Sequence, residues 1–143
     1  MAKSIRDTMT VDPRSITPND QIVEAARLMR DENVGSLPVS DDGRLVGMLT
    51  DRDIAVRVVA EGKSPESTTV GEVFSRNPVA ARPDQDLDEA LQLMAQHQVR
   101  RLPVVEDDRL VGILAQADVA LEEKEKKTGE LVESISQPEA ELR

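Results

Sequence analysis

The sequence of 143 residues predicts an α/β (α+β) fold made of two copies of a β-α-β-β-α unit. A shift of 65 residues aligns positions 10–55 with 75–120 without a gap, and 18 of these 46 pairs are identical. The shared residues are apolar, turn and charged types in the same order, which biased composition alone does not produce. A unit of about 50 residues buries too little surface to be comfortably stable alone. We therefore expect the two units to pack on each other about a pseudo-two-fold axis, with related clefts between them.

Each unit is expected to begin with a short extended segment followed by an amphipathic helix. The extended segments are predicted at 14–16 and 79–81, directly after a proline in each copy. Apolar residues then recur at helical spacing. In the second unit, Asp86 and Glu89 are placed as in a capping box. The helical apolar residues are Ile22, Ala25, Leu28 and Met29 in the first unit, and Leu87, Ala90, Leu93 and Met94 in the second.

Two strands and a second helix complete each unit. Turn residues between runs of β-branched residues and leucine indicate a hairpin in each copy. The turn reads DDG at 41–43 and EDD at 106–108. The strands are predicted at 37–39 and 45–49, and at 102–104 and 110–114, with helices following at about 51–60 and about 116–127.

The repeat also defines the expected domain boundaries. The first unit is placed at 5–62 and the second at 70–121, with a polar linker at 63–69. Residues 122–143 read as a charged tail. Within this tail only Leu131, Val132 and Ile135 form a weak apolar set.

Composition excludes several classes of function. The chain has no cysteine, one histidine and a net charge of −10, which disfavours disulfides, thiolate chemistry and nucleic-acid binding. His97 alone cannot build a catalytic triad or a transition-metal cluster, and we expect it to face solvent. No signal peptide and no apolar run of about 18 residues is visible, so we expect a cytoplasmic protein that does not bind membranes. Accordingly, we predict no enzyme activity, no metal site and no required cofactor.

A hydroxyl and a carboxylate stand three residues apart where the last strand of the first unit meets its second helix. Thr50 and Asp53 fit a helix cap, which contributes roughly 1 kcal/mol and needs no ligand. The same geometry suits a nucleotide, because a helix N-terminus attracts phosphate and a carboxylate accepts hydrogen bonds from ribose hydroxyls. The second unit keeps Asp118 but has Ala115, a poor capping residue, in place of the threonine. Retention of the carboxylate without the cap favours the binding interpretation over capping alone.

Both copies resemble the cystathionine-beta-synthase (CBS) domain. The resemblance is carried by EAARLMRDENVGSLPVSDDGRLVGMLTDRDI in the first copy and EALQLMAQHQVRRLPVVEDDRLVGILAQADV in the second. It covers about residues 5–120, and several elements recur twice at fixed spacing. A tandem pair of this kind is called a Bateman module. The length, GMLTDRDI, HQVRR and the tail are most similar to small stand-alone bacterial CBS proteins of the hypoxic-response type.

The resemblance implies that adenosine-containing ligands bind between the copies. In the family, a (Ser/Thr)-x-x-Asp pattern after the third strand contacts the ribose and phosphate of the ligand. Thr50 and Asp53 match this pattern fully. Asp118 matches it too, whereas Ala115 departs from it and puts the second motif in doubt.

The resemblance also assigns Arg100 and Arg101 to the cleft of the opposite copy's motif, where they would contact phosphate. The alternative is a solvated strand end paired with carboxylates. Val79–Ala81 and Val99 would form an aliphatic wall for adenine, because the chain's single aromatic residue, Phe74, offers no aromatic platform. The main cleft is thus expected to comprise Thr50, Asp53, Val79, Ala80, Ala81, Val99, Arg100 and Arg101. A weaker second cleft is expected to comprise Ile16, Val34, Gly35, Ser36 and Asp118.

Two functional hypotheses follow. The first is a ligand-sensing regulatory module, a homodimer that binds AMP, ADP, ATP or another adenosine derivative and shifts its conformation in response. The second is a ligand-free interaction or scaffold protein that acts on an unknown protein partner through the dimer face or the tail. The altered second motif and the lack of an output domain favour the second hypothesis, and the intact first motif favours the first.

Overall fold

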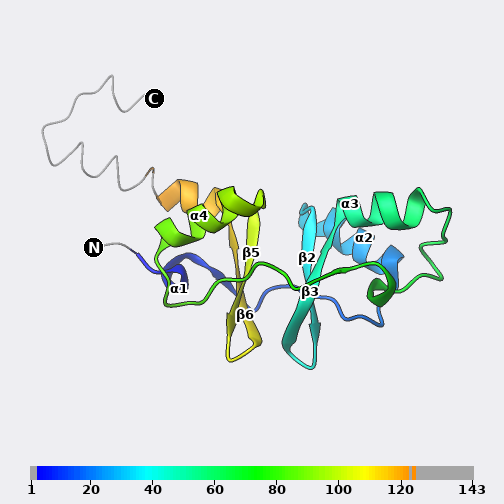
Figure 1. Ribbon diagram of the computed structural model, residues 1–143, viewed down its shortest axis with the longest axis horizontal. Coiled ribbons are helices and arrows are strands. Elements are labelled where there is room, and N and C mark those ends of the chain that lie inside the picture. Colours follow the sequence, from blue (N-terminus) through cyan, green and yellow to red (C-terminus); the bar gives the residue numbers. More distant parts are fainter. Residues whose placement is uncertain (1–2, 123, 125–143) are drawn as a thin grey trace, which may run out of the picture.

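The computed structural model describes residues 3–122 and 124, and within them the chain forms two lobes placed side by side (Figure 1). Helices lie on one side of each lobe, and a β-hairpin extends to the other side. The first lobe contains α2 (Ile22–Glu32), β2 (Ser36–Asp41), β3 (Arg44–Thr50), α3 (Asp51–Ile54) and a π-helical segment η1 (Ala55–Val59). The second lobe contains α4 (Leu87–His97), β5 (Arg101–Glu106), β6 (Arg109–Ala115) and a helix at 116–122. The predicted fold class is confirmed.

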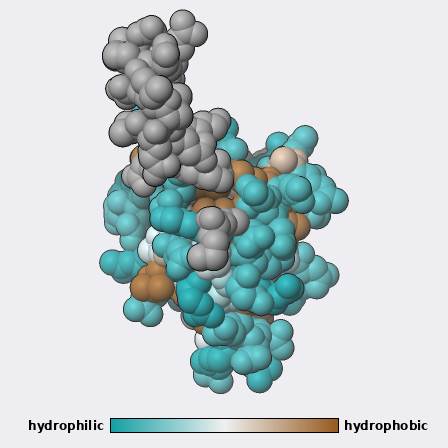
Figure 2. Space-filling model, turned by 90° about the vertical axis from the view of Figure 1, so that its left-hand side faces the viewer, coloured by the Kyte–Doolittle hydropathy of each residue, from teal (hydrophilic) through white to brown (hydrophobic). Residues whose placement is uncertain are grey.

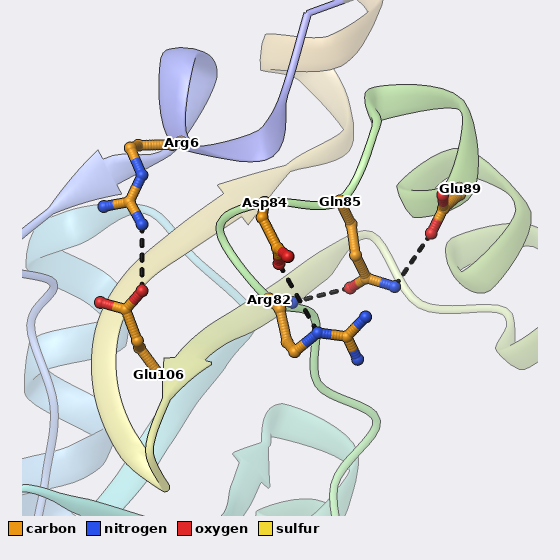
Figure 3. Close-up of polar contacts among 6 residues, drawn as sticks. All are labelled: Arg6, Arg82, Asp84, Gln85, Glu89 and Glu106. Carbon is orange, nitrogen blue, oxygen red and sulfur yellow. Dashed lines mark hydrogen bonds and ion pairs between the residues drawn. The ribbon is translucent and has the colours of Figure 1, made fainter.

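The first helix of each unit buries the apolar face that its spacing predicts. The buried positions of α2 are repeated at the same places in α4, and both helices end at a residue with a left-handed backbone, Asn33 and Gln98. The predicted capping box at Asp86 is wrong, because the Asp86 side chain makes no capping hydrogen bond. Glu89 instead accepts a hydrogen bond from the Gln85 amide at 3.1 Å (Figure 3). The buried residues are Ile22, Ala25 and Met29 in α2 and Leu87, Ala90 and Met94 in α4.

The predicted hairpins are present and are joined by two-residue loops. Both residues of each loop, 42–43 and 107–108, have positive φ, as in the tight turns that match strand twist. The two hairpins meet near these loops, where the Leu45 N–H donates to the Asp108 carbonyl at 3.1 Å and the Leu110 N–H donates to the Gly43 carbonyl at 3.0 Å. Under the 65-residue shift each of these bonds is the counterpart of the other. The hairpins are therefore related as a pseudo-two-fold axis requires.

The predicted extended segments add a short parallel contact to each lobe. Ile16 forms an isolated bridge with Val39 of β2, and Ala81 forms the equivalent bridge with Val104 of β5. The side chains of both bridge residues are buried in the hydrophobic cores. Each core is thus closed on one side by the segment that precedes the first helix.

An exchange of segments, which the sequence analysis does not predict, connects the two lobes. Helix α1 (Ile5–Thr8) and strand β1 (Thr10–Val11) lie at the start of the first unit in the chain but pack on the second lobe, where Thr10 pairs with Ile113 of β6. The 3₁₀ turn η2 (Val70–Glu72) and strand β4 (Ser75–Arg76) lie at the start of the second unit in the chain but pack on the first lobe. The two hydrophobic cores therefore do not coincide with the two stretches of sequence expected as units.

Polar contacts hold both exchanged segments in place. Arg6 of α1 forms an ion pair with Glu106 at the end of β5, with 3.0 Å between Nη2 and Oε2 (Figure 3). Each segment begins with a capping box, formed by Ser4 with Asp7 and by Thr69 with Glu72. Hydrogen bonds from the Thr69 backbone N–H and hydroxyl hold the pKa of Glu72 below its usual range. The two segments are thus built alike, although they lie on opposite lobes.

The surface at the second-lobe end of the molecule is mainly hydrophilic, with small separate hydrophobic areas (Figure 2). This agrees with a chain in which 32% of residues are charged. The apolar set Leu131, Val132 and Ile135 lies outside the described residues. No helix in the described part of the chain is long and apolar enough to span a membrane.

Candidate ligand-binding cleft

A cleft of about 1100 Å³ lies between the two lobes. Its lining residues fall within five segments, 33–36, 48–52, 75–79, 98–103 and 115–120. Segments 33–36 and 98–101 are repeat counterparts, as are 50–52 and 115–117. The cleft is therefore formed by equivalent parts of both units that face each other.

Residues from both clefts expected from the sequence line this cleft. Eight predicted residues line it, and five do not. Ile16 and Ala81 are buried in the cores, and Asp53 is 9% exposed. The lining residues are Thr50, Val79, Val99, Arg100 and Arg101 from the main set and Val34, Gly35 and Ser36 from the second. The residues outside the lining are Asp53, Ala80, Ala81, Ile16 and Asp118.

Thr50 and Asp53 form a complete capping box at the start of α3. The Asp53 N–H donates to Thr50 Oγ1 at 3.0 Å, and the Thr50 N–H donates to Asp53 Oδ2 at 3.0 Å. The Ser75 hydroxyl lies 3.4 Å from both carboxylate oxygens of Asp53. The carboxylate is therefore turned toward the fold. Because Thr50 Oγ1 accepts in this box, its own proton stays available for donation into the cleft.

The helix that follows each hairpin is hydrogen-bonded to the residue that precedes the first strand of that hairpin. The Asp51 N–H donates to the Gly35 carbonyl at 2.9 Å, and the Gln116 N–H donates to the Arg100 carbonyl at 2.7 Å. These bonds place residues 35–36 and 100–101 next to the two helix N-termini. Asp118, the counterpart of Asp53, is half-buried, and its side chain makes no hydrogen bond with another residue in the described part of the chain.

Four arginines line the cleft: Arg52, Arg76, Arg100 and Arg101. The Nε of Arg101 is buried without a hydrogen-bond partner among the described residues. The guanidinium of Arg76 lies 4.7 Å from the centre of the Phe74 ring. Sequence reasoning missed Arg52 and Arg76. Arg52 was visible inside the TDRD motif, whereas Arg76 reaches the cleft only because β4 packs on the first lobe.

Aliphatic side chains form the rest of the lining. Phe74 is buried in the first core and does not line the cleft. A flat ligand ring would therefore lie against aliphatic groups, as the composition predicts. These groups are Val34, Met48, Pro78, Val79, Val99 and Pro103.

Metal ligands do not gather in the described residues. No group of three or more His, Cys, Asp or Glu side chains there is placed to hold a metal ion. His97 is exposed at the end of α4, as predicted.

Fold and cleft together define a two-repeat α/β module with a ligand-sized space between its repeats. The family profile of the CBS domain matches residues 2–60 and 70–125. The chain belongs to the CBS domain family. This confirms the resemblance on which the site prediction depends.

Two curated relatives match over most of their length. The CBS domain-containing protein YhcV of Bacillus subtilis is 51% identical over 118 residues, which are 82% of this chain and 84% of YhcV. Hypoxic response protein 1 of Mycobacterium tuberculosis is 38% identical over 136 residues, which are 94% of this chain and 95% of that protein.

Three solved structures share the fold. The structure of Hypoxic Response Protein I with two coordinated zinc ions has a TM-score of 0.76 at 39% identity, and the match covers 82% of this chain and 97% of that one. The CBS domain pair of MJ0100, in complex with 5-methylthioadenosine and S-adenosyl-L-methionine, has a TM-score of 0.77 at 30% identity. This match covers 88% of this chain and 99% of that one. CBSX2 in complex with AMP has a TM-score of 0.76 at 27% identity, and the match covers 87% of this chain and 98% of that one.

Proposed function

We propose that this chain is a ligand-sensing regulatory module that binds an adenosine-containing nucleotide in the cleft between its repeats. The observation that carries the proposal is a cleft lined by aliphatic groups, the Thr50 hydroxyl and four arginines without carboxylate partners among the described residues. The ligands named for MJ0100 and CBSX2 support an adenosine derivative. The matched family is defined by a domain and not by a catalytic activity, which supports a non-enzymatic role.

Each part of the ligand has a proposed place. Arg100, Arg101 and the Thr50 hydroxyl would bind phosphate, because charge-assisted bonds from guanidinium groups are stronger than neutral ones. Val79 and Val99 would contact the adenine. Contact of Asp53 with the ribose stays a prediction and requires its carboxylate to turn away from the capping box.

The regulatory mechanism would follow from the position of the cleft. A ligand that contacts both lobes favours the arrangement of lobes that it binds better. It can shift the conformational equilibrium by no more than its difference in affinity for the two states. A cytoplasmic location, expected from the sequence, remains a prediction.

Nucleotide binding is tested by thermal shift and calorimetry with AMP, ADP, ATP, S-adenosylmethionine and cyclic di-AMP. A ligand at 100 times its Kd is expected to stabilise the fold by about 2.7 kcal/mol. Lack of any response to all five compounds would refute the proposal and favour the ligand-free interaction protein.

Two matched variants test the predicted asymmetry of the motif. Asp53→Asn removes the charge but keeps an oxygen that can accept from the Thr50 N–H, so the cap is retained. We expect it to weaken binding about tenfold, in line with the loss of a charged hydrogen bond. Asp118→Asn, at the equivalent position, is expected to change binding less than twofold. Equal losses would contradict the asymmetry, and unchanged binding by Asp53→Asn would leave Asp53 a cap only.

We also propose that the chain forms a homodimer. Val56 and Leu121 occupy equivalent repeat positions, and their apolar side chains are 46% and 57% exposed. Light scattering is expected to give twice the 15.7 kDa of the chain. The double variant Val56→Glu/Leu121→Glu is expected to return it to the mass of one chain. A wild-type mass of one chain would contradict the dimer, and an unchanged dimer in the double variant would contradict this surface.

A further inference from the structure

We infer that the ligand of the cleft is a nucleoside diphosphate or triphosphate, whose phosphate chain bridges two pairs of arginines on opposite lobes. The inference rests on the proposed function and narrows its ligand class. Arg52 and Arg76 form the first-lobe pair, and Arg100 and Arg101 form the second-lobe pair. All four line the same cleft.

The fold assigns each pair to its lobe. Arg52 lies in α3, and Arg76 of β4 pairs with Gly47 of β3, so both belong to the first lobe. Arg101 pairs with Ala115 of β6 in the second lobe. Arg76 joins the first lobe only through the segment exchange, because it belongs to the second unit in sequence.

The four arginines lack carboxylate partners among residues 3–122. Each of the six ion pairs in this range is formed by a basic residue other than these four arginines. Scarcity of carboxylates does not explain this, since the chain has 28 acidic residues against 18 basic ones. Asp51 is the one carboxylate that lines the described cleft. The cleft is therefore locally cationic in a strongly anionic chain.

Two of the arginines show features of a site prepared for an anion. The buried Nε of Arg101 has no partner, which costs free energy unless an acceptor binds there. Arg76 is held over the Phe74 ring, an arrangement that limits the positions of its guanidinium. An anion between the pairs would supply the missing acceptors and remove the repulsion between the guanidinium groups.

The repeat indicates that this charge is not a by-product of duplication. Under the 65-residue shift, the counterparts of Arg52, Arg76, Arg100 and Arg101 are Ala117, Val11, Gly35 and Ser36. None of these counterparts is charged. The arrangement therefore predicts one phosphate-chain site and not two.

The number and placement of the arginines select the ligand class. Guanidinium groups can bind phosphate oxygens in a bidentate manner, and a longer phosphate chain offers more such oxygens than a single phosphate. Two pairs on facing lobes suit successive phosphates of one chain. A sulfonium ligand such as S-adenosylmethionine would instead place a positive charge in a cationic cleft.

Calorimetry with ATP, ADP, AMP and inorganic tripolyphosphate tests the inference in wild type, Arg52→Gln, Arg76→Gln and Arg44→Gln. Arg44 is an exposed arginine outside the cleft and serves as the control. We expect wild type to bind ATP at least about tenfold more tightly than AMP. Arg52→Gln and Arg76→Gln should each reduce this ratio about fivefold or more, and Arg44→Gln should leave it unchanged. Circular dichroism melts verify that the variants fold.

The outcomes separate this inference from the proposed function. If AMP binds as tightly as ATP, or if the cleft variants keep the wild-type ratio, the inference is overturned while nucleotide binding stands. A third outcome is that tripolyphosphate binds to wild type but not to the cleft variants, and that no adenosine compound binds. In that case the phosphate site is supported and the proposed function fails. Binding of none of these compounds overturns both.

Discussion

Replacing Ile5 with alanine is expected to lower the free energy of unfolding by about 2–5 kcal/mol, although Ile5 lies close to the N-terminus. Its side chain is 0% exposed and belongs to the core of the second lobe. Its N–H donates to the Gln85 carbonyl at 2.8 Å, which ties α1 to that lobe. Losing a buried isoleucine removes apolar contacts and leaves a cavity that the surroundings fill only in part.

Urea unfolding measures this loss, and two variants serve as controls. Val11→Ala alters the same segment at a side chain that is 61% exposed, so we expect a change within about 0.5 kcal/mol. Val70→Ala, at the repeat counterpart of Ile5, removes a fully buried side chain from the first lobe and is expected to be clearly destabilising. An Ile5→Ala effect as small as that of Val11→Ala would show that α1 is not part of the second core.

Gly47→Ala is expected to destabilise the fold by about 1–3 kcal/mol or more, because the added methyl group has no space. It would lie 2.3 Å from the Ser75 carbonyl oxygen and 2.4 Å from the Phe74 ring. The Ser75 backbone cannot withdraw easily, since β4 pairs with β3 at Met48 and Ser75. Because β4 also carries Ser75 and Arg76 into the cleft, we expect nucleotide binding to weaken as well.

Gly112→Ala provides a matched comparison at the equivalent position of the second unit. There the methyl group would lie 2.6 Å from Met9 Sδ and 3.0 Å from the Thr10 carbonyl oxygen. A methionine side chain adjusts more readily than a buried ring, so a smaller loss of stability is expected. Thermal and urea unfolding of both variants measure the difference. A loss for Gly112→Ala equal to or larger than that for Gly47→Ala would contradict this account.

Much of the fold could be predicted because the sequence patterns that indicate its helices and hairpins are local and occur in both copies. Helical spacing predicted α2 and α4, and turn residues between β-branched runs predicted the hairpins. The segments 5–11 and 70–76 could not be assigned in this way. Their elements have two to four residues each, too few to show a period, and their partners lie far along the chain.

The candidate site could be predicted in part because the family resemblance assigns roles to particular motifs. It placed Thr50, Arg100 and Arg101 at the ligand, and the structure brings these residues to one cleft. Arg76 could not be included, because its place depends on the exchanged strand β4. The orientation of the Asp53 carboxylate was also open, since a cap and a ligand contact require the same residue at the same spacing.

The order of residues in the chain was sufficient for the two-fold repetition, the strands and helices of each unit and the family resemblance. These features depend on short-range periodicity and on identities between aligned copies. Long-range packing decided which lobe each exchanged segment joins, and thereby which arginines share the cleft. It also decided that the Asp53 carboxylate turns toward Thr50 and Ser75, because only the folded chain brings Ser75 next to α3.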